Sequence, residues 1–149
     1  MTKPNTSVDA MARSCIAVRL RLLNRVVTNI YDEELRPLGL KASQLNVLIV
    51  TAKLGVARPA RVCEILQLDA STLSRNVERM RSAGWLEVVP EADARAQPFR
   101  LTVKGRRLMD NVVPYWEKAQ RRAAELLGDE AMEALAKAVV KLGGPRAEC

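Results

Sequence analysis

The sequence predicts a mainly α-helical protein with one small two-stranded β-sheet. Three observations support this fold class. The apolar residues are mostly Leu, Val and Ala, and aromatic residues make up only 3% of the 149-residue chain, a composition that favours helices packed on helices. Over most of the length, apolar residues recur at steps of three and four, the period of an amphipathic helix. Between residues 86 and 101 they alternate with polar residues instead, which predicts two short strands.

The first predicted helix runs from residue 10 to residue 35. Two adjacent rows of apolar residues, which begin at Met11 and Ile16, follow its length. Together they form a stripe too wide for one small partner, so we expect this helix to be covered from two sides. Pro37 marks its exit, and a second apolar helix is predicted over residues 43–54.

Two short helices separated by a tight turn are predicted next. Pro59 suits the first turn of one helix. Asp69 stands at the expected N-cap of the other, where its carboxylate can accept the free N–H groups of Ser71 or Thr72. Gly84 follows as a left-handed stop. The order of these signals predicts a helix-turn-helix.

The second helix of this pair has two chemically different faces. At about 100° per residue, Leu73, Val77 and Met80 fall on one side, which suits a core. The opposite side carries hydroxyl and charged groups: Ser71, Thr72, Ser74, Arg75, Glu78 and Arg79. Such a front can reach phosphates and base edges in a DNA major groove. An ordinary amphipathic surface helix would show the same pattern, so the flanking segments decide between the two interpretations.

The residues after this helix predict a hairpin with a charged tip. Two apolar pairs alternate with polar residues, as half-buried strands do: Leu86 and Val88, then Phe99 and Leu101. The segment between them is polar and carries Asp93 and Arg95. Helix, turn, helix and a charged wing together make a winged helix-turn-helix.

Two further helices are predicted after the hairpin. Thr102 can cap the first, which opens at Val103 and continues to Gly128. Pro114 inside it is expected to bend it, because a proline ring displaces a backbone hydrogen bond. The last helix covers residues 129–142.

The helices outside the winged domain can pack in two ways. They can form one intramolecular bundle, or they can interdigitate with a second copy of the chain. A second copy would cover the wide apolar stripe and place two recognition helices about one DNA turn (roughly 34 Å) apart on an inverted repeat. We therefore assign dimerisation helices to residues 10–35 and 103–142, the winged helix-turn-helix domain to residues 36–102, and disordered tails to residues 1–9 and 143–149.

The charge distribution favours a nucleic-acid partner. The net charge is +7, and between Arg58 and Arg107 basic residues outnumber acidic ones by four, so this third of the chain holds more than half of the excess. A basic surface alone is weak evidence for nucleic acid. Concentrated on a winged helix, it is stronger evidence.

The same composition argues against several other classes of protein. The chain contains no histidine, its three cysteines are widely spaced, and no Cys-x-x-Cys pair is present, so we expect no structural metal, no cofactor and no enzyme activity. The sequence has no run of about 18 apolar residues, so no membrane span is predicted. The first nine residues lack the apolar core of a secretion signal, and we expect a cytoplasmic protein.

Four segments resemble the MarR family of transcriptional regulators, over a stretch from about residue 10 to residue 142. They are residues 68–75 (LDASTLSR), the Asp93-Ala-Arg95 wing, residues 101–105 (LTVKG) and the run from Pro114 to Gln120. The resemblance implies an obligate homodimer that usually represses genes near its own.

The resemblance also implies roles for individual residues. Ser71, Thr72, Ser74 and Arg75 would face the major groove, and Arg95 would enter the minor groove with Asp93 positioning it. A narrow A·T-rich minor groove attracts such an arginine. Lys104 and Arg106 are candidate phosphate contacts, with a solvated face as the competing interpretation. The predicted DNA contacts are Ser71, Thr72, Ser74, Arg75, Arg79, Asp93, Arg95, Arg58 and Lys104.

The chain departs from the family pattern at two helix starts. Lys41 and Arg58 stand where a capping hydroxyl is common. Each exchanges a cap for a positive charge near a helix N-terminus, a change expected to cost from a few tenths to about 1 kcal/mol. Because Arg58 is near the DNA-facing module, we predict a phosphate contact as its compensating role.

Two kinds of signal are known in the family. Many members release DNA when a small phenolic or aromatic acid binds between the dimer helices and the winged domain, and Tyr31 matches one tyrosine of the usual pair. Others sense oxidants through a cysteine in the first helix. Cys15 lies near that position, about two residues early, and could be activated by Arg13 or Arg19. Buried packing is the competing role for this thiol.

The predicted function is that of a homodimeric, sequence-specific DNA-binding transcriptional regulator, a repressor that binds an inverted-repeat operator and is released by a small aromatic or phenolic effector. Three alternatives stay open: a redox-sensing repressor that uses Cys15, a winged-helix protein-interaction module without DNA binding, and the dimerisation domain of an enzyme. The operator, the regulated genes and the effector are not encoded in any pattern recognised in the sequence.

Overall fold

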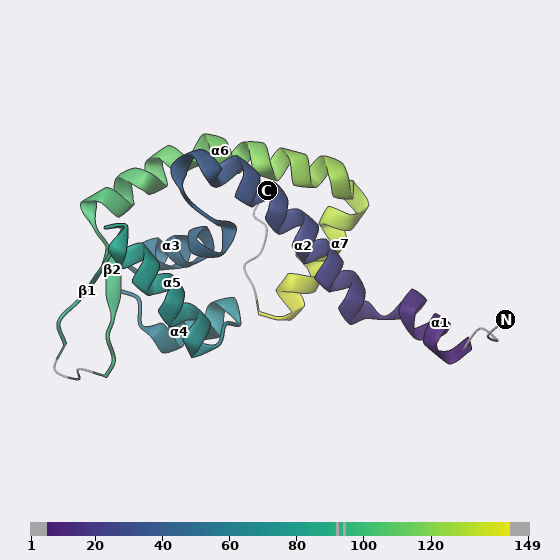
Figure 1. The fold of residues 1–149 in the computed structure, drawn as a ribbon, viewed down its shortest axis with the longest axis horizontal. Helices are drawn as coiled ribbons and strands as arrows, with labels where there is room; N and C mark the ends of the chain where they lie inside the picture. The colour runs from purple at the N-terminus through teal and green to yellow at the C-terminus, as the bar shows by residue number, and fades with distance from the viewer. Residues whose placement is uncertain (1–5, 92, 94, 144–149) are drawn as a thin grey trace.

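The computed structural model describes residues 6–91, 93 and 95–143. Mainly helical with a two-stranded antiparallel sheet, it confirms the predicted fold class (Figure 1). The elements follow in the order α1 (Thr6–Ser14), α2 (Ile16–Leu35), the 3-10 turn η1 (Arg36–Leu38), α3 (Ala42–Leu54), α4 (Pro59–Leu66), α5 (Ala70–Ser82), β1 (Leu86–Val88), β2 (Phe99–Leu101), α6 (Val103–Leu127) and α7 (Asp129–Lys141).

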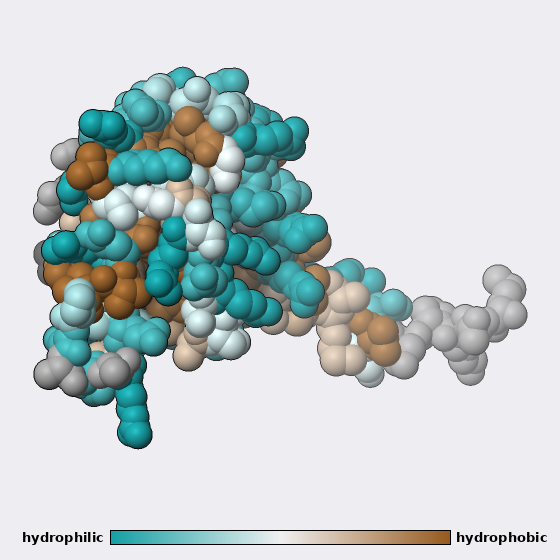
Figure 2. All heavy atoms as spheres, turned by 60° about the vertical axis from the view of Figure 1, so that its left-hand side comes forward, coloured by the Kyte–Doolittle hydropathy of each residue, from teal (hydrophilic) through white to brown (hydrophobic). Residues whose placement is uncertain are grey.

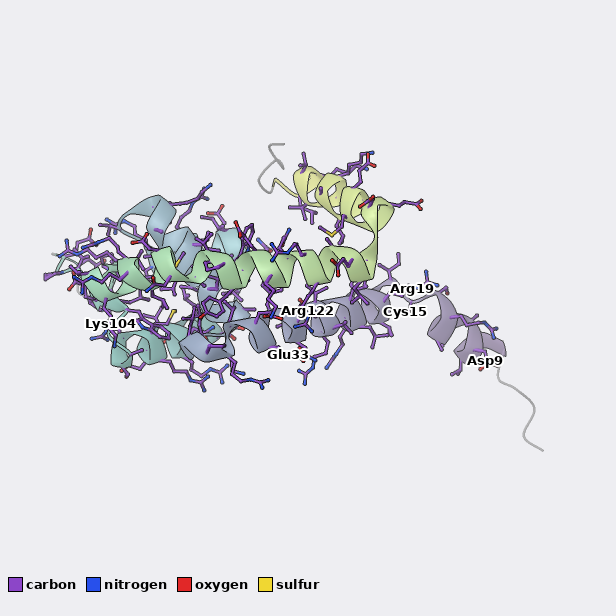
Figure 3. All side chains as sticks on the ribbon, turned by 90° about the horizontal axis from the view of Figure 1, so that it is seen from above. Asp9, Cys15, Arg19, Glu33, Lys104 and Arg122 are labelled. Carbon is purple, nitrogen blue, oxygen red and sulfur yellow. The ribbon has the colours of Figure 1, made fainter. Side chains whose placement is uncertain are left out.

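The helices divide into a cluster, which consists of α3, α4 and α5 with the β1–β2 hairpin, and a set of arms, which are α1, α2, α6 and α7. Figure 1 shows α3, α4 and α5 grouped beside the β1–β2 hairpin, while α6 curves over them and α1 projects at the far end. The most extensive contact between two elements joins α2 to α6, and Arg122 on α6 is paired there with Glu33 and Glu34 on α2. In Figure 3, Arg122 and Glu33 are seen facing each other between the two helices. The long helices are therefore held together by charge as well as by apolar contact.

Most of the hydrophobic core lies in the cluster, and Leu35 on α2 and Val112 on α6 extend it onto the arms. Its largest fully buried side chain is Phe99 on β2, which belongs to the same buried cluster as residues from α3, α4 and α5 such as Leu48, Val62 and Met80. The backbone of Phe99 also exchanges two hydrogen bonds with Ala57, at 2.8 and 2.9 Å. The hairpin is thereby tied to the segment that leads into α4.

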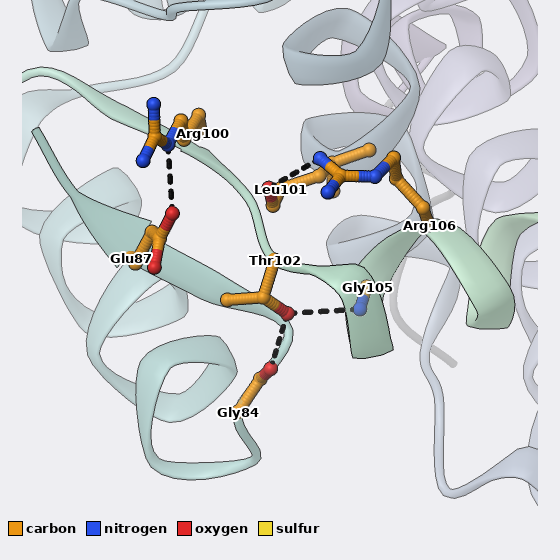
Figure 4. A network of polar contacts seen from close by, with 7 residues as sticks. All are labelled: Gly84, Glu87, Arg100, Leu101, Thr102, Gly105 and Arg106. Atoms are coloured by element: carbon orange, nitrogen blue, oxygen red, sulfur yellow. Dashed lines mark hydrogen bonds and ion pairs between the residues drawn. The ribbon is translucent and has the colours of Figure 1, made fainter.

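The junction between the hairpin and α6 is built around one threonine (Figure 4). The Thr102 hydroxyl accepts from the Gly105 N–H at 2.9 Å, as the predicted cap should, and donates to the Gly84 carbonyl at 2.6 Å. Gly105 is buried, and a Cβ at this position would clash with the Trp85 carbonyl oxygen. The LTVKG segment therefore needs both its threonine and its glycine for close packing.

The N-terminal helix corrects two predictions. One continuous helix over residues 10–35 was expected, but the structure breaks it at Cys15, whose ψ is 112°. At the break the Ser14 hydroxyl donates to the Ala10 carbonyl at 2.6 Å, a bond that competes with the helix ladder and favours a bend. Residues 6–9 were assigned to a disordered tail and are helical instead, since Asp9 in the first turn of α1 and Arg13 in the last complement the helix dipole. Residues 1–5 of that tail lie outside the described residues, as do 144–149 of the C-terminal one.

The start of α3 shows how the unusual Lys41 is accommodated. The Gln44 side chain accepts from the Lys41 N–H at 3.0 Å, and Asp32 on α2 accepts from the Ala42 N–H at 2.8 Å. Two free N–H groups are thus satisfied without a capping hydroxyl. The cost predicted for Lys41 is offset by a carboxylate from another helix.

None of the described helices combines the length and the apolarity that crossing a membrane requires.

Candidate nucleic-acid interface

Helix α5 has the two faces that the sequence predicted. Leu73 and Met80 are 1% and 0% exposed and pack into the core. Ser71, Ser74, Arg75, Glu78 and Arg79 are exposed, and Thr72 is half-buried. Figure 2 looks onto the end of the molecule that carries α3, α4, α5 and the hairpin, and it shows hydrophilic side chains around separate apolar patches. The hydroxyl and guanidinium groups of α5 are therefore available to a partner.

The N-terminus of α5 is organised by Asp69. One carboxylate oxygen accepts from the Thr72 N–H at 2.8 Å and from the Ser71 hydroxyl at 2.5 Å. The other accepts from the Thr72 hydroxyl at 2.7 Å. These donors, the Ser71 hydroxyl first, hold the pKa of the Asp69 carboxyl well below its usual range. The predicted N-cap is confirmed, and two of the predicted DNA-facing hydroxyls belong to it.

The wing brings Asp93 and Arg95 together as expected. The Asp93 carboxylate accepts from the Arg95 N–H at 3.0 Å, and the Arg95 side chain is exposed. The neighbouring residues 92 and 94 lie outside the described residues. Asp93 thus orients the backbone from which Arg95 projects, while the entry of Arg95 into a minor groove stays a prediction.

Arg58 forms a contact that the sequence did not reveal. Its guanidinium makes a two-pronged ion pair with Glu91 at the base of the wing, with one N–O distance of 2.9 Å. The hydrogen bond to Glu91 raises the pKa of the Arg58 guanidinium, and the Asp93 charge adds to the effect. The pair joins the start of α4 to the base of the wing, and the Arg58 side chain remains 58% exposed.

The two basic residues at the start of α6 also make internal contacts. Lys104 Nζ donates to the Ala83 carbonyl at 2.7 Å, at the end of α5, and Arg106 donates to the Leu101 carbonyl at 3.0 Å. A cation at this place suits the negative end of the helix dipole. Of the α5 arginines, Arg81 is paired with Glu78, whereas within the described part of the chain Arg75 and Arg79 are in no ion pair. These two side chains are therefore the free cations on the α5 front.

A cavity of about 430 Å³ lies between α4, α5 and the wing. Its apolar wall includes Cys63, Val77 and Phe99, and Arg95 and Gln97 stand at its wing side. No sequence pattern indicated this cavity, because its walls come from three elements that only the tertiary fold brings together.

The candidate signal-sensing residues lie on the long arms. Cys15 is a half-buried free thiol at the break between α1 and α2. Arg19 is seen beside Cys15 in Figure 3, and its guanidinium donates a hydrogen bond to the Arg13 carbonyl. The Tyr31 hydroxyl donates to the Gln120 side chain across α2 and α6, and burial raises its pKa. Among the described residues no cluster of three or more Cys, Asp or Glu side chains is suited to a metal.

Comparison with known proteins agrees with this geometry. Residues 38–96 match the model of the MarR family. The chain is 27% identical over 115 residues to the HTH-type transcriptional regulator PecS of Dickeya dadantii, covering 74% of this chain and 68% of the relative. It is 28% identical over 87 residues to the multiple antibiotic resistance protein MarR of Escherichia coli, covering 58% of this chain and 60% of that protein, less than two thirds of its length.

Solved structures share the fold across most of the chain. A mutant E. coli MarR complexed with operator DNA superposes with a TM-score of 0.76 at 20% identity, over 95% of this chain and 99% of that one. BpsR of Bordetella bronchiseptica, whose DNA binding is regulated by 6-hydroxynicotinic acid, superposes with a TM-score of 0.74 at 23% identity, over 87% and 94%. Residues 38–96 are thus a MarR-family winged helix-turn-helix domain, and the curated relatives that are similar to the chain are transcriptional regulators.

Proposed function

We propose that the protein is a homodimeric repressor that binds an inverted-repeat operator and is released by a small-molecule effector. The observation that carries the proposal is the exposed front of α5, where hydroxyl and guanidinium groups stand beside the wing that presents Arg95. A helix of this kind enters a major groove while the wing reaches the adjacent minor groove. The operator complex formed by the E. coli relative supports the same use of the shared fold.

The contacts inside the winged domain divide the predicted DNA residues into two groups. Arg75, Arg79 and Arg95 have exposed guanidinium groups that can neutralise phosphates or reach bases. Lys104 and Arg58 instead support the end of α5 and the base of the wing. We propose that these two act on DNA through the elements they hold.

The dimer is proposed from the arms. Large apolar side chains remain exposed on α2, on α6 and just after α7; examples are Ile16 at 71%, Leu22 at 61%, Leu126 at 57% and Leu142 at 86%. Exposed apolar groups on adjoining helices mark an interaction surface. A second copy that packs its own arms against these would bury them and place two α5 helices on one operator.

The proposed effector is a small aromatic or phenolic molecule. Regulation of BpsR by 6-hydroxynicotinic acid supports this class of ligand. A cavity of about 540 Å³ lies between α4 and α7, with Ile65, Val139 and Leu142 as apolar walls and Arg61 beside them. This cavity lies between an arm helix and the winged domain. A ligand bound in it would therefore alter the spacing of the two α5 helices in a dimer.

Selection of genomic DNA fragments by the purified protein tests the proposal. We expect an inverted repeat to be enriched, and its affinity to fall steeply as salt rises. Arg75→Ala and Arg95→Ala should each weaken binding by about tenfold or more. Failure to enrich any fragment, with the protein folded and dimeric, would favour the protein-interaction module instead.

A further inference from the structure

We infer that Asp69 sets part of the base preference of α5 by fixing the hydroxyls of Ser71 and Thr72 as hydrogen-bond acceptors. They would then select a base that offers an amino group in the major groove. On the contacted strand this is adenine or cytosine, in preference to guanine or thymine. The inference rests on the proposed function, because it concerns which base the DNA-facing helix reads.

The geometry commits both hydroxyl protons to Asp69. Ser71 Oγ lies 2.5 Å from Asp69 Oδ1, and Thr72 Oγ1 lies 2.7 Å from Asp69 Oδ2. The same donors keep the pKa of the carboxyl low, so Asp69 stays ionised at neutral pH. An ionised carboxylate only accepts hydrogen bonds. Each hydroxyl must therefore be the donor in its contact with Asp69.

This leaves the hydroxyls with lone pairs alone for a partner. A serine or threonine hydroxyl has one proton and two acceptor lone pairs, and here the proton is already used. In the major groove, N7 and O6 of guanine, N7 of adenine and O4 of thymine are acceptors, whereas the amino groups of adenine and cytosine are donors. Only the two amino groups can complete a hydrogen bond with a hydroxyl of this polarity.

Position and charge make a phosphate contact less favourable for these two hydroxyls. Both are in the first turn of α5, the part of a recognition helix that contacts base edges. Phosphate oxygens are acceptors, and the negative charge of Asp69 lies within hydrogen-bond distance of both hydroxyls. Phosphate binding would therefore rest with cations such as Arg75 and Arg79.

The first experiment uses base analogues with the wild-type protein. In the selected operator, Ser71→Ala and Thr72→Val would each identify the base whose preference depends on that hydroxyl. If the base identified in this way is adenine, it is replaced by purine, which lacks the amino group, or by 7-deazaadenine, which keeps the amino group and lacks N7. If it is cytosine, it is replaced by 2-pyrimidinone, which lacks the amino group. We expect loss of the amino group to weaken binding about fivefold and loss of N7 to have no effect.

The second experiment reverses the hydroxyl polarity with Asp69→Asn. Asparagine is as good an N-cap as aspartate, so the thermal unfolding midpoint should change little. Its amide NH2 would donate to one hydroxyl and release that proton, so the preference for an amino group at that base should disappear. Ser74 is the matched control, since among the described residues it is not one of the groups that Asp69 holds. Any base read through Ser74, identified with Ser74→Ala, should keep its preference in Asp69→Asn.

The outcomes separate the inference from the proposed function. If the wild-type protein selects no DNA, the proposed function fails. If an operator is selected, any one of three results overturns the inference alone: neither hydroxyl variant changes a base preference, 7-deazaadenine weakens binding while purine does not, or Asp69→Asn keeps the wild-type preference. Loss of the amino preference in Asp69→Asn, with the analogue pattern above, supports it.

Discussion

The winged domain and the long arms differ in how many of their large apolar side chains are buried. In the winged domain Val62, Met80 and Phe99 are at most 1% exposed, whereas on the arms Ile16 is 71% and Leu142 86% exposed. Burial of apolar surface is the main favourable term in folding. The winged domain therefore contains most of the core, to which Leu35 of α2 and Val112 of α6 also contribute, and the arms have an apolar surface that a single chain leaves open. The difference shows which apolar surface a partner would have to cover.

The largest effect is expected where the two regions join. Gly105→Ala would drive a methyl group into the Trp85 carbonyl oxygen, and neither backbone can move without disturbing the Thr102 junction. We expect a loss of about 3 kcal/mol or more in the free energy of unfolding, measured by denaturant titration. Gly39→Ala is the control: its φ of +65° is left-handed but nothing lies within 4 Å of a new Cβ, so only about 1 kcal/mol of backbone strain is expected. Equal losses in both variants would show that the junction is not tightly packed.

The next effect tests whether the arms need a second copy. Leu22→Glu places a charge in the exposed apolar surface of α2, where Leu22 is 61% exposed. We expect the dimer to dissociate at least about tenfold more readily, by analytical ultracentrifugation, because a buried unpaired charge opposes association. Leu54→Glu, at a side chain 40% exposed at the end of α3, should leave the dimer unchanged. A dimer that tolerates Leu22→Glu would remove α2 from the proposed interface.

A moderate effect is expected inside the winged domain, at the ion pair of Arg58 and Glu91. If Arg58 holds the wing, Arg58→Ala and Glu91→Ala should each weaken operator binding about threefold, and the double variant should be no weaker than either single variant. If Arg58 were a phosphate contact instead, only Arg58→Ala would weaken binding, and the salt dependence would fall by about one unit of slope. Measuring affinity at several salt concentrations separates these outcomes.

The smallest effect is expected at Cys15, at the break between the two N-terminal helices. Cys15→Ser exchanges a half-buried thiol for a hydroxyl of similar size, so we expect less than about 1 kcal/mol of change in the free energy of unfolding and unaltered operator affinity. The redox hypothesis adds that peroxide lowers the operator affinity of the wild type and not that of this variant. Release of DNA by peroxide in both proteins would eliminate Cys15 as the sensor.

The helix boundaries of the winged domain were predictable because their signals are local. Asp69 and Thr102 cap the helices that begin after them, and Gly84 has the left-handed φ of 79° expected of a stop. Each depends on groups within a few residues, which sequence patterns record directly. The break at Cys15 was missed, because a serine bond to its own helix is common and does not by itself announce an interruption.

By itself, the sequence determined the order of the helices, the caps, the two faces of α5 and the concentration of positive charge around the wing. Periodicity and capping are short-range properties, so these features needed no knowledge of the fold. Only the tertiary structure decided the partners of the long charged side chains. Arg58 meets Glu91 33 residues away, and Lys104 meets Ala83 21 residues away. A flexible cation takes whichever acceptor the fold brings within reach. Within the described part of the chain, Arg75, Arg79 and Arg95 are in no ion pair, on the side that we propose faces DNA.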